Sequence, residues 1–525
     1  MAERRKTAAI DSPPEPFSLE AVRAAVFEGR EPPPARAIER LASYRWFVVG
    51  TVCVGSCMSQ IDASMTQVLL PRLERDFAAP LANVSWVAVA YLLTMASFMP
   101  IFGRLADMFG RKLLYLAVFL IFILGSGLCG FAPDLATLIA CRIAQAVGAA
   151  LVTSNSTAII VMATSAEERG RGLGLQSAAQ AVGLGAGPAI GGLLLDTLGW
   201  RWAFWVNVPV GLTAVILGWF IIPRSRPVSD PGGFDWRGAV LIAPALTALV
   251  AALNEAHAWG PTSPALIGCL VMGAACLVLF IRTEHRAAPP LLDLKLLGTP
   301  SFLLGNAANF LSYAALFGVF FVIPFALERL YHVSELSAGL RLSLLPVTLG
   351  LMAPVGGALY DRFGARMPAS GGMLVCIAGL ALFYVFLDGS RDNLPFVMLG
   401  LAVFGAGQGL FISPNSSAIM AAASPEMTGE AGSVLNIARY IGISAGIAGA
   451  STLLAFSLGS ARESTLDVDA PTLVAASRNV VILLICLATA AGTISLLRGQ
   501  GSHQSRACWI QSSRRVRLTS SARPA

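Results

Sequence analysis

Two side chains of opposite charge lie inside long apolar stretches of this chain, and they are the first candidates for chemistry. Asp62 lies in the apolar run 46–70 and Arg142 in the run 135–163. A charge at the centre of a bilayer costs about 2.5–3.5 kcal/mol on insertion scales, so it is kept only where it meets water or a partner. Burial and a neighbouring cation shift the pKa of a carboxyl in opposite directions, so such a group can load and release a proton. We therefore expect Asp62 to hold a proton or a cationic substrate, with a static ion pair or a place near the outer rim beside Pro71 as the alternatives.

Arg142 and Asp62 lie at similar depths, because each is in the outer half of its apolar run. A buried arginine needs a partner, so we expect either a pair with Asp62 or hydrogen bonds to backbone carbonyls. A third charge, Arg439, lies in the run 433–458, and with Asp62 and Arg142 it is a candidate for proton coupling or substrate binding. Together with four uncharged polar residues it is expected to line a central cavity, unless these four make hydrogen bonds between helices; they are Asn306, Asn309, Gln408 and Asn415.

The elements that must position these residues follow from the composition. The 525 residues are 55% hydrophobic and 13% charged, against roughly 25% charged in soluble domains. This composition excludes a disordered chain, a disulfide-rich secreted module and an ordinary soluble enzyme. A spanning helix needs about 20 mostly apolar residues, and fourteen runs qualify: 46–70, 84–103, 113–131, 135–163, 173–195, 202–222, 238–254, 264–281, 302–325, 338–359, 367–387, 394–422, 433–458 and 474–497.

Lys and Arg positions orient these runs. With the N-terminus inside, inner segments carry 27 of the 37 basic residues and outer segments seven, as the positive-inside rule requires. We therefore expect both termini to be cytoplasmic, in a bacterial inner membrane. The polar stretches 1–45 and 498–525 are expected to be cytoplasmic tails, the first of them disordered, and no cleavable signal peptide is visible.

Other kinds of site are not indicated. The nine cysteines and four histidines form no metal-binding pattern, and the phosphate-binding pattern GxxxxGK[ST] is absent. We therefore expect no metal, no cofactor, no catalytic residue set and no nucleic-acid partner. If the chain moves a solute uphill, the energy is expected to come from an ion gradient.

An internal repeat divides the spans. The stretch Gly103–Lys112 recurs as 357–366, and Leu151–Ile159 recurs as Phe411–Ile419. Both copies have the same inside–outside polarity, so the repeats are parallel and related by an axis along the membrane normal. We expect an all-α membrane protein with an N-terminal six-helix bundle over 46–222, an inserted helix pair over 238–281 and a C-terminal six-helix bundle over 302–497.

These motifs resemble those of the major facilitator superfamily, and within it the fourteen-span drug:proton antiporters of the EmrB/QacA type. The resemblance covers residues 46–497. Gly103-x-Leu-x-Asp107-x-x-Gly110-Arg-Lys112 is similar to the inner-loop signature of the superfamily, and Gly183–Gly192 is similar to the antiporter signature of the fifth span. Gln60-Ile-Asp62 resembles the acidic first span of drug exporters, and Gly199–Pro209 resembles the entry to the sixth span.

The resemblance implies roles for these residues. It implies that Arg142 tunes Asp62 or transmits its protonation. The inner loop is expected to act as a conformational latch, or only to set topology, through Gly103, Asp107, Gly110, Arg111, Lys112, Asp361 and Arg366. Three glycines of the fifth span, Gly183, Gly187 and Gly191, are spaced by four and lie on one face, where a helix can approach closely. With Pro188 and Gly192 they are expected to form a hinge-like seal between the halves, or else ordinary helix packing.

The function expected from this pattern is export of hydrophobic or amphipathic small molecules in exchange for protons, by alternating access. Its partners would be the substrate, protons and the bilayer, and a periplasmic adaptor is left open. The alternatives are an exporter of one metabolite on the same scaffold, a uniporter or importer, and a membrane sensor. The run 338–359 has no acidic residue between 342 and 359, which disfavours export of dications.

Overall fold

The fourteen expected spans are present as helices. The computed structural model describes residues 34–165, 168–225, 235–260, 262–286, 294–424, 427–459 and 468–498, and these residues contain no strand. Fourteen helical segments are long and apolar enough to cross a membrane. They are α4 (Tyr44–Phe77), α5 (Leu81–Phe109), α6 (Arg111–Gly130), α7 (Leu135–Ala163), α8 (Arg169–Thr197), α9 (Trp200–Trp205) with α10 (Asn207–Ile221), α11 (Trp236–Asn254), α13 (Pro264–Glu284), α14 (Pro300–Arg329), α15 (Glu335–Leu342) with α16 (Leu344–Phe363), α17 (Arg366–Phe386), α18 (Leu394–Ala421), α19 (Thr428–Leu458) and α20 (Ala470–Leu497).

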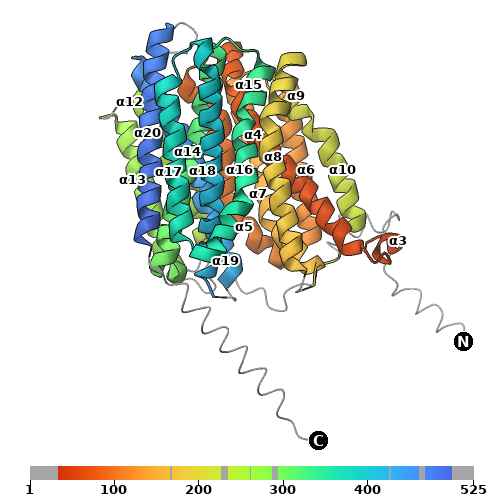
Figure 1. Ribbon diagram of the computed structural model, residues 1–525. Helices are drawn as coiled ribbons and strands as arrows, with labels where there is room; N and C mark the ends of the chain where they lie inside the picture. Colours follow the sequence, from red (N-terminus) through yellow and green to blue (C-terminus); the bar gives the residue numbers. More distant parts are fainter. Residues whose placement is uncertain are drawn as a thin grey trace, which may run out of the picture.

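The helices stand side by side as one upright bundle (Figure 1). We call the end at which α4 begins the lower end and the end at which α4 finishes the upper end. Several helices that begin at the upper end carry a capping residue there. Asp134 accepts a hydrogen bond of 2.8 Å from the Thr137 amide at the start of α7, and Ser263 caps the amide of Ala265 at the start of α13. Such caps satisfy amides that a helix start leaves unpaired.

The predicted repeat is visible at two turns of the lower end. Gly110 joins α5 to α6 with φ +96°, and Gly364 joins α16 to α17 with φ +73°. Both values lie in the region that glycine adopts without strain. The helix pairs that follow are alike: a Cβ on Gly125 of α6 would lie 2.6 Å from the Gln145 amide of α7, and one on Gly379 of α17 would lie 2.6 Å from the Phe404 amide of α18.

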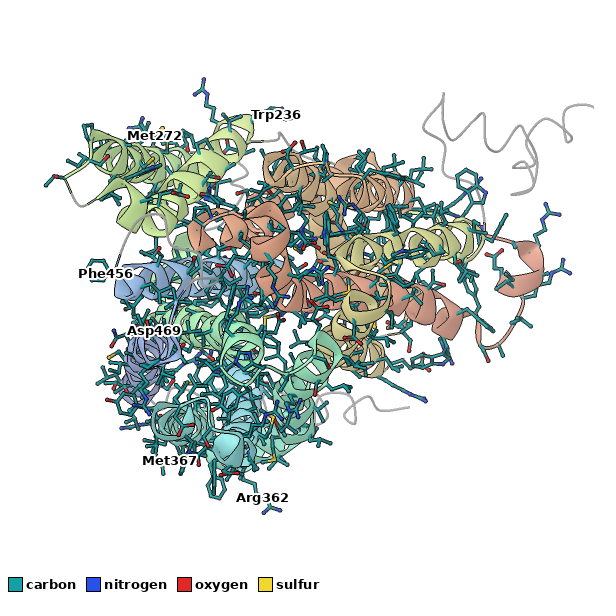
Figure 2. The ribbon with its side chains drawn as sticks, turned by 90° about the horizontal axis from the view of Figure 1, so that it is seen from above. Trp236, Met272, Arg362, Met367, Phe456 and Asp469 are labelled. Atoms are coloured by element: carbon teal, nitrogen blue, oxygen red, sulfur yellow. The ribbon has the colours of Figure 1, made fainter. Side chains whose placement is uncertain are left out.

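The inserted pair, α11 and α13, lies at the edge of the bundle. Figure 2 shows Trp236 and Met272 of this pair at the periphery, beside the two six-helix bundles. Only 11% of the apolar 18-residue segment of α13 is buried inside the protein. By contrast, α11 is attached at the upper end to α5, where Ser85 Oγ donates to Asn254 Oδ1 at 2.8 Å. It is also attached to α19, where Thr452 Oγ1 donates to the Leu253 carbonyl at 2.8 Å. The inserted pair therefore touches both bundles.

The boundaries of the two tails differ from the expectation. Within the predicted N-terminal tail, the Ala35 amide donates to the Phe220 carbonyl at 2.8 Å, and a helical turn, α3, covers Arg36–Glu39. Arg498, assigned to the C-terminal tail, is buried and donates to Asn415 Oδ1 and Ser301 Oγ, each at 2.9 Å. Burial lowers the pKa of Arg498 to about 10, so it is still charged at neutral pH. The remaining tail residues, 1–33 and 499–525, lie outside the described residues.

Substitution of Asn254 tests the attachment of the inserted pair. Asn254→Leu removes the bonds to Ser85 Oγ and to the Ala82 carbonyl. Hydrogen bonds between membrane helices contribute about 0.6–1.7 kcal/mol, so we expect the thermal unfolding midpoint of the purified protein in detergent to fall by a few degrees. Asn479→Leu is the control, because Asn479 is exposed and bonds only to Ser457. Equal midpoints for the two variants would contradict the attachment.

Candidate functional site

Asp62 lies near the middle of a helix that is longer than the sequence indicates. Helix α4 has 34 residues and runs through Pro71 to Phe77, whereas the apolar run ends at residue 70. The side chain of Asp62 is fully buried. Its position near the outer rim, one of the alternatives considered for it, is therefore wrong, because the last turns of α4 continue above it.

The carboxylate of Asp62 accepts from three donors on two other helices, α7 and α10. Its Oδ2 lies 2.6 Å from Nη1 of Arg142 on α7, and the two groups form an ion pair. Its Oδ1 accepts from Nε2 of Gln145 on α7 at 2.9 Å and from Nδ2 of Asn207 on α10, also at 2.9 Å. Three donors thus converge on one anion, which offsets its loss of hydration.

Arg142 is as enclosed as its partner, with a side chain 1% exposed. Its remaining donors go to Gln145 Oε1 at 2.7 Å, to Thr66 Oγ1 at 3.2 Å and to the Val87 carbonyl of α5 at 3.1 Å. The guanidinium also lies 4.0 Å from the ring centre of Tyr91. The structure thus gives Arg142 both of the partners considered for it, Asp62 and a backbone carbonyl.

This Asp62–Arg142 network joins four helices at one level. It consists of Asp62 and Thr66 on α4, Tyr91 on α5, Arg142 and Gln145 on α7, and Asn207 on α10. Removing one member of a buried ion pair leaves an uncompensated charge and typically costs 3–5 kcal/mol. The packing of α4, α7 and α10 is therefore tied to the charge of a single carboxyl group.

Sequence reasoning did not assign the uncharged members of the network. Two signals were present. Gln145 lies three residues after Arg142, and Thr66 lies four residues after Asp62, spacings that put each pair on one helix face. Asn207 starts α10 after α9 ends at Trp205, and this break directs its amide at Asp62 and Ser126.

The three glycines spaced by four in α8 face α4. A Cβ on Gly187 would contact Ser64 Oγ and lie 2.9 Å from the Ile61 carbonyl, and one on Gly191 would lie 2.6 Å from Met65 Cγ. This close approach is the one that the spacing predicts. Both helices belong to the N-terminal bundle, however, so this face is not itself a seal between the halves. It packs against the turn of α4 that carries Asp62.

One close contact between the halves is made by Gly192. A Cβ there would lie 2.6 Å from the Glu335 carbonyl and 3.2 Å from Gly339 Cα, both on α15 of the C-terminal bundle. The Pro188 carbonyl faces Gly339 in the same contact. Of the residues expected to form the seal, Gly192 and Pro188 therefore lie at an interface between the halves, in the upper half of α8, and their hinge-like role stays a prediction.

Ion pairs close the upper end beside this contact. Arg72 pairs with Glu335 at 3.1 Å, Arg75 with Glu328 at 3.2 Å, and Arg329 with Glu74 at 3.3 Å. Each pair joins α4 to α14 or α15, so each crosses from one bundle to the other. Glu74 and Glu328 are buried. The halves are thus held together at the upper end by charge as well as by backbone contact.

The predicted latch lies at the lower end. Asp107 is in the last turn of α5, and its side chain lies outside the described residues. The amides of Arg111 and Lys112, which start α6, donate to Ser225 Oγ at 2.8 and 3.1 Å. A Cβ on Gly103 would meet nothing within 4 Å, so this glycine does not serve a close approach. In the second copy, Asp361 and Arg366 are exposed.

The four uncharged candidates for a cavity are buried between helices instead. Asn309 donates to the Leu435 carbonyl at 3.2 Å, Asn415 to the Gly305 carbonyl at 3.1 Å, and Asn306 to the Phe302 carbonyl of its own helix at 2.9 Å. Gln408 accepts from Ser312 Oγ at 2.7 Å. Three of the four, Asn309, Gln408 and Asn415, thus make hydrogen bonds between helices, which was the alternative considered for them, and a role in lining a cavity stays a prediction.

Arg439 differs from all of these. It is partly exposed, and the rings of Tyr313 and Tyr440 lie 5.3 and 5.5 Å from its guanidinium carbon. It is not part of the Asp62–Arg142 network. Among the described residues, no group of three or more His, Cys, Asp or Glu side chains is arranged to hold a metal ion.

Comparison with known proteins gives a consistent picture. A model of the Major Facilitator Superfamily matches residues 52–447 and also residues 305–497. The chain is 33% identical to the riboflavin transporter RibZ of Clostridioides difficile over 79% of this chain and 89% of that protein. It is 31% identical to a multidrug resistance protein B homolog of Mycobacterium tuberculosis over 77% and 75%. A bacterial homolog of the human lysosomal transporter Spinster, solved in an inward-facing conformation, shares the fold with a TM-score of 0.61 at 18% identity, over 87% of this chain and 97% of that one.

The glycine face of α8 can be tested by adding volume. Gly187→Val would force α8 away from α4 beside Asp62, so we expect transport by the protein in vesicles to be lost or to become leaky, while membrane insertion continues. Gly174→Val is the matched control on the same helix, because a Cβ there would meet nothing within 4 Å. Normal transport by the Gly187 variant would show that the close approach is dispensable.

Proposed function

The chain belongs to the Major Facilitator Superfamily and is a multi-pass membrane transporter rather than an enzyme, and we propose that it exports hydrophobic or amphipathic small molecules in exchange for protons. The proton gradient is the energy source in this proposal, and no cofactor takes part. The named function of the multidrug relative supports the choice of substrates.

One observation carries the proposal. Asp62 is the one acidic residue that lies away from the ends of the fourteen spans; every other acidic residue of these segments is in a first or last turn. It is fully buried, and it accepts hydrogen bonds from Arg142, Gln145 and Asn207. An ionisable residue kept at this depth marks a candidate functional site, and proton relays in transporters are one such use.

Protonation of Asp62 changes what the network can satisfy. The carboxylate accepts from three donors, but a carboxylic acid brings a donor of its own and removes the negative charge beside Arg142. At least one of the three donors must then turn to another acceptor, and the guanidinium must find another counter-charge or water. Because the donors come from α7 and α10, the two protonation states favour different packings of these helices against α4, which biases the transport equilibrium.

The direction follows from the orientation that Lys and Arg positions give. In the proposal the lower end is cytoplasmic, both termini are in the cytoplasm of a bacterium, and the protein lies in the inner membrane. The upper end, with its three ion pairs between the halves, is then the external side. This conformation is closed to the outside, as a transporter is before it releases substrate there.

A second candidate is supported by a specific similarity. The relative named as a riboflavin transporter is 33% identical, so export or import of one metabolite on this scaffold is the alternative. The breadth of substrates separates the two. A screen in which a single compound is moved would favour the alternative, and movement of several unrelated dyes would favour the proposal.

Vesicle transport tests the role of Asp62. In inverted vesicles with an imposed pH gradient, we expect wild-type protein to accumulate dyes or drugs in a gradient-dependent way. Asp62→Asn keeps the shape of the side chain but cannot change its charge, so we expect gradient-dependent accumulation to fall by at least tenfold. Gradient-driven transport at the wild-type level in this variant would refute the proton-binding role, and no gradient-dependent flux of any compound by wild-type protein would refute the proposal itself.

Arg142→Lys separates charge from geometry. Lysine retains the positive charge, but it lacks the planar fork that reaches Asp62, Thr66 and the Val87 carbonyl together. We expect the variant to insert normally and to lose most proton-coupled transport, with a shifted pH dependence of the residual rate. An unchanged pH profile and rate would mean that only the charge of Arg142 matters.

A further inference from the structure

Arg439 is a cation inside the bundle without an anion. Among the described residues it makes no hydrogen bond and no ion pair, and its contacts are with the rings of Tyr313 and Tyr440. Cation–ring contacts contribute about 0.5–2 kcal/mol, but they leave the positive charge in place. Arg142, a buried arginine of the N-terminal bundle, has a carboxylate at 2.6 Å. The difference calls for a partner of Arg439 that the described residues do not supply.

The side chains of Arg439 and Tyr313 are each left partly exposed where α19 and α14 pack together. Helix α14, which carries Tyr313, is the most buried of the spans: 83% of its apolar segment is buried. The two helices are in close contact next to these residues, since a Cβ on Gly442, three residues after Arg439, would lie 3.0 Å from the Cα of Phe310, three residues before Tyr313. Arg439 and Tyr313 therefore border an uncovered space beside the contact between α14 and α19.

No carboxyl group competes for this space. Away from the ends of the described spans, the acidic residue is Asp62, and its two oxygens are already taken by Arg142, Gln145 and Asn207. A cationic substrate would therefore find no free anion at this depth. An anionic substrate would find an arginine with free donors, and arginine donors suit carboxylates and sulfonates.

We propose that Arg439, with Tyr313 and Tyr440, recognises the substrate, and that the substrate class is organic anions that carry an aromatic or other flat apolar body. The anionic group binds the guanidinium, and the apolar body lies against the tyrosine rings. This inference rests on the proposed function, because it names the substrates that the exporter takes.

The same residues connect this site to Asp62. Helix α19 packs against α5 across the interface between the halves. Tyr440 of α19 lies beside Arg439, with its ring centre 5.5 Å from the guanidinium carbon, and the ring centre of Tyr91 on α5 lies 4.0 Å from the guanidinium carbon of Arg142. An anion bound at Arg439 and a proton bound at Asp62 thus act on two arginines separated by a pair of tyrosines. Binding of an anion at Arg439 therefore changes the electrostatic potential at Arg142, and binding of a proton at Asp62 changes the potential at Arg439.

Equilibrium binding of three shape-matched probes tests the proposal. The probes are naphthalene-2-sulfonate, naphthalene-2-sulfonamide and 2-naphthyltrimethylammonium, which are anionic, neutral and cationic. Binding to the purified full-length protein is measured by dialysis in an uncharged, lipid-depleted detergent, so that anionic lipid headgroups cannot occupy the site. We expect the sulfonate to bind about tenfold or more tightly than the cation, since that factor corresponds to a modest charge interaction.

Variants of Arg439 test whether this residue causes the preference for the sulfonate. Arg439→Gln is expected to weaken sulfonate binding about tenfold or more and to leave sulfonamide binding within about twofold, with a smaller loss in Arg439→Lys. Arg478→Gln is the matched control, because Arg478 is also a span arginine beside a tyrosine ring, but it donates to the Val385 carbonyl at 3.2 Å. This control is expected to bind like wild type.

Several results would overturn the inference. They are binding of none of the probes by wild-type protein, equal or preferred binding of the cation, wild-type sulfonate affinity in Arg439→Gln, and an equal loss in Arg478→Gln. The measurement needs no gradient and no transport direction. Failure of proton coupling with intact selectivity at Arg439 would therefore refute the proposed function alone, and gradient-driven export with no role for Arg439 would refute this inference alone.

Discussion

A carboxylate placed in the middle of an apolar bundle must be fully satisfied by its surroundings, and the ion pair between Asp62 and Arg142 meets that requirement. Its consequences extend through the N-terminal bundle. Arg142 needs a carbonyl from α5, Asp62 needs an amide from α10, and α8 must come close to α4 through glycines to enclose the turn that carries the acid. The arrangement of five helices is therefore compatible with one charge state of one side chain, and a proton is the smallest change that alters it.

The two halves have the same fold but differ in the side chains that surround their central arginines. The N-terminal bundle pairs its central arginine with an acid, and the C-terminal bundle surrounds its own with two tyrosines. The uncharged polar residues of the C-terminal bundle are used for packing, as the bonds of Asn309, Gln408 and Asn415 show. In our proposals, a duplicated scaffold has thus kept its helix positions while one half binds the proton and the other binds the substrate.

Much of this could be predicted from the sequence, because a membrane imposes strong rules. The fourteen helices follow from apolar runs of sufficient length, and Asp62 and Arg142 stand out because charges are rare there. Gln145 and Asn207 were missed as part of the network because an uncharged amide costs little in a helix and is common. For Asn306 and its neighbours, the sequence does not tell whether an amide faces a space or a carbonyl. The glycines of α8 predicted a close neighbour, but only the structure shows that it is α4, within the same bundle.

The inserted pair has a mechanical consequence. Because α11 is bonded to α5 in one bundle and to α19 in the other, both at the upper end, the bundles are tethered along one edge of their interface. If they separate at that end, the gap is narrow beside α11, because both bundles are bonded to that helix. The gap is wide at the opposite edge, where Gly192 contacts Gly339. A molecule leaving through the upper end would then pass along the α8–α15 edge, and the tether sets how far that edge can open.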